Sequence, residues 1–225
     1  MLMKPDFDIN YMMQSFPVLA KYVYLTVSLA VISMIIGLII ALVLVAIGTY
    51  KIKILDPLSK IYISFFRGTP LLVQLFLLYY GLPQIITVFK SLDAYTATVI
   101  GLSMNASAYM VETLRGAISS VDKGQMEAAL SIGMSHWQGM KRVVLPQAAR
   151  VAIPSLGNTF VDLLKSSSLA FTLGVAEILA QAQMAAAATY KFFENYLAVA
   201  LIYWGIIIFF NYIQRILENK MNHAY

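Results

Sequence analysis

Polar side chains recur at helical spacing within otherwise apolar stretches of this sequence. Asn105, Tyr109 and Glu112 stand at positions i, i+4 and i+7, so a helix would place all three on one face. A second set, Asn158, Asp162 and Lys165, has the same spacing. It is directly followed by three serines, Ser166, Ser167 and Ser168. Carboxylates, an ammonium group, amides and hydroxyls can together hold a small solute that carries both a positive and a negative charge. These residues are therefore candidate solute-binding groups.

The composition places these groups in a membrane protein. Of the 225 residues, 60% are apolar and 12% are charged, whereas soluble domains average roughly 45–50% and about 25%. Segments that are apolar on every face require lipid as their solvent. The formal net charge of +5 then reflects an asymmetry between loops, and we expect no nucleic-acid partner.

The sequence offers neither metal chemistry nor a catalytic nucleophile. It contains no cysteine, which excludes disulfides, thiolate metal sites and cysteine nucleophiles. His136 and His223 have no carboxylate or histidine partner at ligand spacing, so we expect no metal site. None of the 12 glycines is followed by lysine, so the sequence contains no phosphate-binding P-loop. The chain is not expected to be an enzyme.

Long stretches free of charge predict five membrane-spanning helices in one all-α integral membrane domain, residues 1–225. About 20 apolar residues cross a bilayer core. The first stretch is too long for a secretory signal and lacks its basic cluster. The fourth is expected to be one discontinuous helix broken at the three serines, where freed backbone groups must be buried in protein or line an aqueous cavity. The predicted spans lie within residues 22–50, 68–89 with a possible start near 57, 94–120, 151–194 and 195–214.

Basic residues predict the orientation, because they concentrate in cytoplasmic loops. If the N-terminus is outside and the C-terminus is cytoplasmic, 11 of the 16 basic residues lie on the inner side and Lys165 lies within the membrane. The inner residues are then Lys51, Lys53, Lys60, Arg67, Arg115, Lys123, Lys141, Arg142, Arg150, Arg215 and Lys220, and the outer ones are Lys4, Lys21, Lys90 and Lys191.

Residues 121–150 form a long inner loop in this topology, and long loops tend to carry function. We expect a short helix from Gln125 to Ile132, ended or bent by Gly133. Ser135 is placed to cap a second helical piece that stops before Pro146. Residues 125–138 contain no Lys or Arg, unlike a helix that rests on lipid head groups.

Four ordered motifs resemble one protein family. In the long loop, the residues that match the pattern known as the EAA loop are Glu127, Ala128, Ala129, Gly133, Leu145 and Pro146. Upstream, RGTPLLVQ from Arg67 and AYMVETLRG from Ala108 also match, and so does the downstream tract from Ser168 to Tyr190. With these motifs the chain resembles the ATP-binding-cassette (ABC) importer permeases of the polar amino acid branch, such as histidine, lysine and glutamine permeases.

The resemblance implies a type I ABC importer permease fold, multi-pass in a bacterial cytoplasmic membrane. It implies a path for a polar amino acid delivered by an extracellular or periplasmic binding protein. It also implies a cytoplasmic ATP-binding subunit dimer, which would use ATP and Mg and leave this chain without a cofactor. A second permease chain, identical or related, would complete the complex. The EAA loop would be a coupling helix seated in a cleft of the ATPase.

Two interpretations of the charges inside the membrane remain open. Such a charge costs at least about 2.5–3.5 kcal/mol, so it is a functional candidate by default. In the first interpretation the two polar sets line the path of the amino acid. In the second, Glu112 pairs with Arg115 and Asp162 pairs with Lys165, and these pairs only hold helices together. Gln74 is expected to form a hydrogen bond between helices.

Two other classes of function compete with the importer. An ion-coupled secondary carrier would use Glu112, Asp162 and Lys165 as a relay. A membrane scaffold would not transport at all. Five spans without an internal repeat count against the carrier, since many carriers are built from repeated halves.

Overall fold

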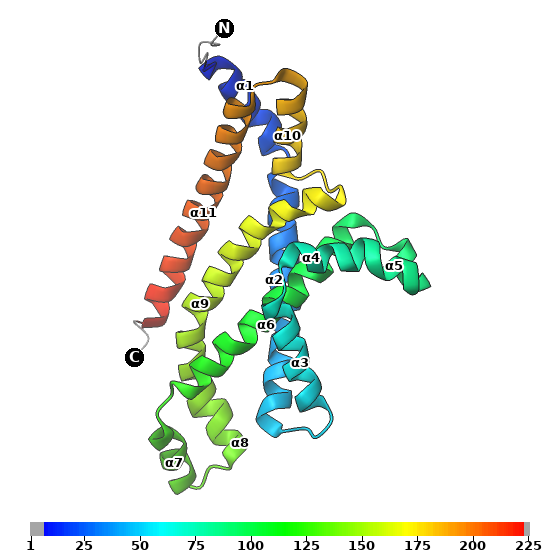
Figure 1. Ribbon diagram of the computed structural model, residues 1–225. Coiled ribbons are helices and arrows are strands. Elements are labelled where there is room, and N and C mark those ends of the chain that lie inside the picture. Colours follow the sequence, from blue (N-terminus) through cyan, green and yellow to red (C-terminus); the bar gives the residue numbers. More distant parts are fainter. Residues whose placement is uncertain (1–6, 223–225) are drawn as a thin grey trace.

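The computed structural model describes residues 7–222, with side chains up to Lys220. Lys4 and His223, both named above, lie outside this part of the chain. All regular elements within it are helices, which confirms the all-α fold class (Figure 1). The elements are α1 (Ile9–Ala20), α2 (Val23–Tyr50), α3 (Leu55–Gly68), α4 (Leu71–Phe76), η1 (Leu77–Gly81), α5 (Leu82–Ile85), η2 (Thr87–Ser91), α6 (Ala94–Ser119), α7 (Lys123–Ser131), α8 (His136–Gly139), η3 (Met140–Val144), α9 (Leu145–Ser166), η4 (Ser167–Leu173), α10 (Ile178–Thr189) and α11 (Phe192–Asn222).

Helix α6 is the central helix of the fold, packed against α2, α3, α4 and α9. Its tightest neighbour is α2, which turns a stripe of small residues toward it, including Ser33, Gly37 and Ala41. A Cβ atom at Gly37 would lie 3.1 Å from the carbonyl oxygen of Ser103. Small side chains at such contacts let helix backbones approach closely in a membrane.

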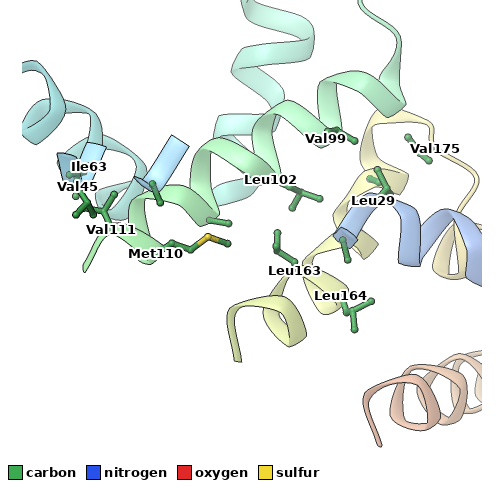
Figure 2. Close-up of a cluster of buried hydrophobic side chains, with 14 residues drawn as sticks. Leu29, Val45, Ile63, Val99, Leu102, Met110, Val111, Leu163, Leu164 and Val175 are labelled. Carbon is green, nitrogen blue, oxygen red and sulfur yellow. The ribbon is translucent and has the colours of Figure 1, made fainter. Parts of the chain in front are cut away.

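The main apolar core lies where α2, α6 and α9 meet. Leu29, Leu102 and Leu163 point toward one another from these three helices and are almost completely buried (Figure 2). In lipid this packing acts through van der Waals contacts, because the lipid tails are as apolar as leucine. The core therefore fixes the distance between α6 and α9, the two helices that carry the candidate residues.

The predicted span at residues 68–89 is wrong as a single helix. Helix α3 starts near the suggested position, but the chain bends by 113° between Leu55–Gly68 and Leu71–Ile85. The bend lies at Thr69 and Pro70, which are both extended. The physical reason is the proline, because its ring keeps the preceding residue out of the α conformation.

The predicted discontinuity of the span within residues 151–194 is confirmed, but its position at the three serines is wrong. The α-helix ends at Ser166 and continues as the 3₁₀-helix η4, and the bend of 53° follows at Gly174, whose φ is +95°. The hydroxyls of Ser167 and Ser168 each donate to the carbonyl oxygen three residues earlier, at 2.7 Å. These bonds satisfy carbonyl groups within the helix, and glycine adopts the left-handed conformation without steric cost.

Length and composition mark two helices of the described chain, α2 and α11, as able to cross a membrane by themselves. Two bent pairs, α3 with α4–α5 and α8–η4 with α10, meet the same test if each pair counts as one span, so up to four spans result. Helix α6 is not among them. Its serines, threonines and Asn105 lower its hydropathy, yet half of the helix is buried among its neighbours.

Candidate functional site

A cavity of about 390 Å³ lies between α6 and α9. Six of the nine predicted solute-binding residues line it, three from each helix: Asn105, Tyr109 and Glu112, and Asn158, Asp162 and Ser166. Leu71, Leu102, Ala106 and Leu163 supply its apolar wall. Helical spacing thus brings the two polar sets together across one cavity.

The other three predicted residues do not line the cavity. The Nζ atom of Lys165 lies 2.7 Å from Oδ1 of Asp162, so Lys165 reaches the site through this ion pair. Ser167 is fully buried, and the hydroxyls of Ser167 and Ser168 are bonded to their own helix. Ser167 and Ser168 therefore stabilise their own helix, and of the three serines Ser166 is the one that lines the cavity.

Two threonines of the cavity wall were not among the residues predicted from the sequence. Thr113 and Thr159 both line it. Thr113 follows Tyr109 by four residues, and Thr159 precedes Asp162 by three, so both lie on the polar faces that the spacing had marked. Each directly follows a residue already marked, Glu112 and Asn158, so widening each face by one residue would have identified them.

Asn105 and Gln74 connect the broken helix to the cavity wall. The Gln74 amide donates to the carbonyl oxygens of Phe66 and Thr69, each at 3.0 Å. The Asn105 amide donates to the same Phe66 oxygen at 3.1 Å and to Oε1 of Gln74 at 3.0 Å. These bonds confirm Gln74 as a hydrogen-bonding residue between helices. They also occupy both amide protons of Asn105, so that its carbonyl oxygen is the atom left for a solute.

Glu112 is held by two arginines. Its Oε1 lies 3.7 Å from Nη1 of Arg67 and 3.5 Å from Nη1 of Arg115. The Arg67 guanidinium also lies 5.8 Å from the ring centre of Tyr109, in a cation–π contact. A Cβ atom at Gly48 of α2 would lie 2.5 Å from the Arg115 side chain, so glycine makes room for it. Glu112 thus both lines the cavity and pairs with arginines.

At the end of the molecule that carries α7 and α8 (Figure 1), α7 and Gly133 form the turn expected from the sequence. Gly133 has a φ of +83°, and two bonds close the turn, from Gly133 to Leu130 at 3.0 Å and from Met134 to Ala129 at 3.1 Å. This is the Schellman arrangement that favours glycine after a helix. Ser135 caps α8 with a reciprocal bond to Gln138, as predicted.

The remaining EAA-motif residues occupy three different environments. Glu127 and Ala128 are exposed on α7, while Ala129 is buried against α8. Leu145 and Pro146 are exposed on the first turn of α9. The expected stop before Pro146 is wrong, because the helix from His136 continues through the π-turn η3 into α9. The wider π-turn accommodates a proline that cannot donate a backbone hydrogen bond.

The opposite end carries a polar cluster that joins α1 to α11. The Asp8 carboxylate pairs with Lys191, and the Asp8 amide donates to Glu194 at 3.0 Å. Hydrogen bonding to Lys191 lowers the pKa of Asp8, and the same bond raises the pKa of Lys191. At neutral pH Asp8 and Lys191 are therefore both charged.

A buried glutamate at the second helix bend was not anticipated. Glu177 is fully buried and caps α10, accepting from the amides of Leu179 and Ala180 at 2.9 Å and from the Tyr203 hydroxyl at 3.0 Å. Its position directly before an apolar run is the available signal, since a carboxylate is favourable at a helix N-terminus. Glu177 holds the bend after Gly174 against α11.

Within residues 7–222, His, Cys, Asp and Glu side chains form no group of three or more that could bind a metal.

The chain matches known membrane transport components over most of its length. Residues 33–223 match the family described as "Binding-protein-dependent transport system inner membrane component". The "Probable amino-acid ABC transporter permease protein PatM" of Vibrio harveyi is 55% identical over 97% of this chain and 98% of its own length. The "Probable amino-acid permease protein YxeN" of Bacillus subtilis is 49% identical, with 97% of both chains covered.

Two solved structures share the fold. One, described as an amino acid ABC transporter with histidines, is 35% identical with a TM-score of 0.88, covering 96% of this chain and 99% of the other. An inward-facing MetNI methionine ABC transporter has a TM-score of 0.74 at 16% identity, over 93% of this chain and 97% of the other, and shows the fold alone.

Proposed function

The chain belongs to the family of binding-protein-dependent transport system inner membrane components, and we propose that it is the permease subunit of an ATP-driven amino acid importer. Its relatives named as amino-acid permeases match it over nearly their whole length, which favours the importer over the ion-coupled carrier. A pair of cytoplasmic ATP-binding subunits would hydrolyse ATP with Mg²⁺, and an external binding protein would deliver the substrate. The complex would lie in the bacterial cytoplasmic membrane.

The cavity between α6 and α9 is the observation that carries this proposal. It combines two carboxylates, two amides and four hydroxylated side chains with an apolar wall, in a chain that is 60% apolar overall. An amino acid needs an acceptor for its ammonium group and donors for its carboxylate, and this lining offers both. Asn105, Tyr109, Glu112, Asn158, Asp162 and Ser166 are the proposed contacts, and Lys165 acts through Asp162.

We infer five spans with the N-terminus outside and the C-terminus in the cytoplasm. Helix α6 is the span to be added to the four described above, since most of its polar residues pack against other helices or line the cavity. The bent pairs α3–α5 and α8–α10 each count as one span. This topology places α7 on the inner side and the Asp8 and Lys191 pair on the outer side, in agreement with the excess of basic residues inside.

The turn between α7 and α8 is the proposed ATPase contact. Glu127 and Ala128 lie exposed on α7, and the large apolar side chains of Leu130, Ile132 and Trp137 are exposed around the turn. A water-facing turn with such side chains fits burial against a partner protein. Gly133 sets the direction of the turn, while Ala129 supports it from within.

Substrate protection of single cysteines tests the proposed cavity. The chain has no cysteine of its own, so Asn158→Cys provides a single reactive thiol in the cavity wall. We expect this thiol to react with a methanethiosulfonate reagent, and the transported amino acid to slow the reaction. Ser155→Cys is the control, because Ser155 is exposed on the same helix and is not part of the cavity lining. Equal rates with and without amino acid at Asn158→Cys would contradict the proposal.

A further inference from the structure

The carboxylates of the cavity are already neutralised by this chain. Glu112 pairs with Arg67 and Arg115 at 3.7 and 3.5 Å, and Asp162 pairs with Lys165 at 2.7 Å. The two carboxylates line the cavity, whereas the three cations do not. Each negative charge therefore faces the cavity with a positive charge beside it.

The pair at Asp162 is intramolecular and local. Asp162 and Lys165 are three residues apart on α9, a spacing that places their side chains side by side. A positively charged ligand must displace or share this neighbour to pair with Asp162. Since Lys165 is tethered to the same helix, it competes at high effective concentration.

The remaining polar groups of the wall are neutral and available. Within residues 7–222, the side chains of Asn158, Thr113 and Ser166 make neither a hydrogen bond nor an ion pair. An amide and two hydroxyls can donate to a carboxylate or bind an uncharged polar side chain. The wall thus has free hydrogen-bonding capacity and lacks an uncompensated negative charge.

We propose that the cavity selects amino acids whose side chain is uncharged, and that Lys165 determines this selectivity. This inference rests on the proposed function. The ammonium and carboxylate of such a substrate sum to zero, which matches a wall whose carboxylates are compensated. A cationic side chain would add a charge without a free counter-ion. So would an anionic one, because the three cations are paired with Glu112 and Asp162 and do not line the cavity. A charged ligand that loses water without gaining a counter-ion binds more weakly, so the unpaired charge discriminates against it.

Competition binding with matched variants tests the role of Lys165. The purified permease–ATPase complex is incubated with radiolabelled glutamine and with unlabelled glutamine, arginine or glutamate as competitor. For the wild type we expect arginine and glutamate to compete at least about tenfold more weakly than glutamine, as expected for an unpaired charge. Lys165→Gln should strengthen competition by arginine about tenfold relative to glutamine, because Asp162 then lacks its partner. Lys165→Arg should restore the preference for glutamine.

Lys60→Gln is the matched control. Lys60 forms a pair with Asp56 at the same 2.7 Å, on α3 and away from the cavity, and this variant should keep the wild-type preference. A wild type that prefers arginine or glutamate would overturn the inference, whatever the folding of the variants. So would a Lys165→Gln preference equal to that of the wild type. Binding of no amino acid, charged or uncharged, would instead contradict the proposed function itself.

Discussion

Asp162 and Lys165 form an ion pair with each other, but they differ in their position relative to the cavity. Asp162 lines the wall, whereas Lys165 does not and only pairs with Asp162. The two interpretations of this pair, substrate path or helix packing, therefore differ in a way that an exchange of the residues reveals. An exchange preserves the pair and the net charge, but it moves the ammonium group into the wall.

We expect the double variant Asp162→Lys with Lys165→Asp to abolish uptake while expression and basal ATP hydrolysis persist. The matched exchange Asp56→Lys with Lys60→Asp, an ion pair outside the cavity lining, should leave uptake unchanged. Uptake of radiolabelled amino acid by cells that carry the complex measures both. Near-normal uptake by the variant in which Asp162 and Lys165 are exchanged would show that this pair only holds helices together.

Gln74 stabilises the bend at Thr69 by bonding to carbonyl groups that the broken helix leaves free. We expect Gln74→Leu to lower the free energy of unfolding by about 1–3 kcal/mol, the usual cost of an unsatisfied buried polar group. A lower thermal unfolding midpoint in detergent would report this loss. Gln84→Leu, which removes an amide bonded to Tyr80 on an exposed turn, is the control. Equal midpoint changes in the two variants would contradict the assignment.

At the scale of elements, charge-free runs predicted α2, α6 and α11, because length and apolarity suffice to define a straight span. Hydropathy carries no direction, so the turn at Pro70 and the bend after Gly174 were not placed correctly. Spacing brought Asn105, Tyr109 and Glu112 to one wall, since helix geometry alone fixes a shared face. The burial of Glu177 escaped detection because Tyr203, which donates to its carboxylate, lies on another helix and 26 residues away in the sequence.

The turn between α7 and α8 depends on the backbone of Gly133. Nothing lies within 4 Å of a Cβ atom at this position, so a side chain would act through its strain at φ +83° alone. We expect Gly133→Val to reorient the turn and so to reduce both copurification of the ATPase and uptake. The exposed change Glu127→Lys should reduce both as well, because it reverses a charge on the proposed contact surface. Strain in the left-handed region costs about 1–2 kcal/mol per residue.

Gly205→Val is the control for this element. Gly205 lies within α11, has equally open surroundings and has no positive φ. Wild-type recovery of the ATPase with Gly133→Val, together with intact uptake, would remove the turn from the coupling site.

At the scale of the whole molecule, one chain leaves its cavity open. The Asp162 side chain is 69% exposed and Tyr109 is 46% exposed. Such groups are costly against lipid, so a second permease chain should cover this side. We expect light scattering of the purified complex to give two permeases with two ATPases. An active complex with a single permease would contradict this arrangement.

Reconstituted uptake tests the central claim most directly. Vesicles that contain the permease and its ATPase, with the binding protein on the outer side, are supplied with radiolabelled glutamine and with either ATP or a proton gradient. The account predicts accumulation that requires ATP, the ATPase and the binding protein, and that is lost in the Asp162 and Lys165 exchange. Accumulation driven by the proton gradient alone, without ATP or the ATPase, would contradict it and favour the ion-coupled carrier.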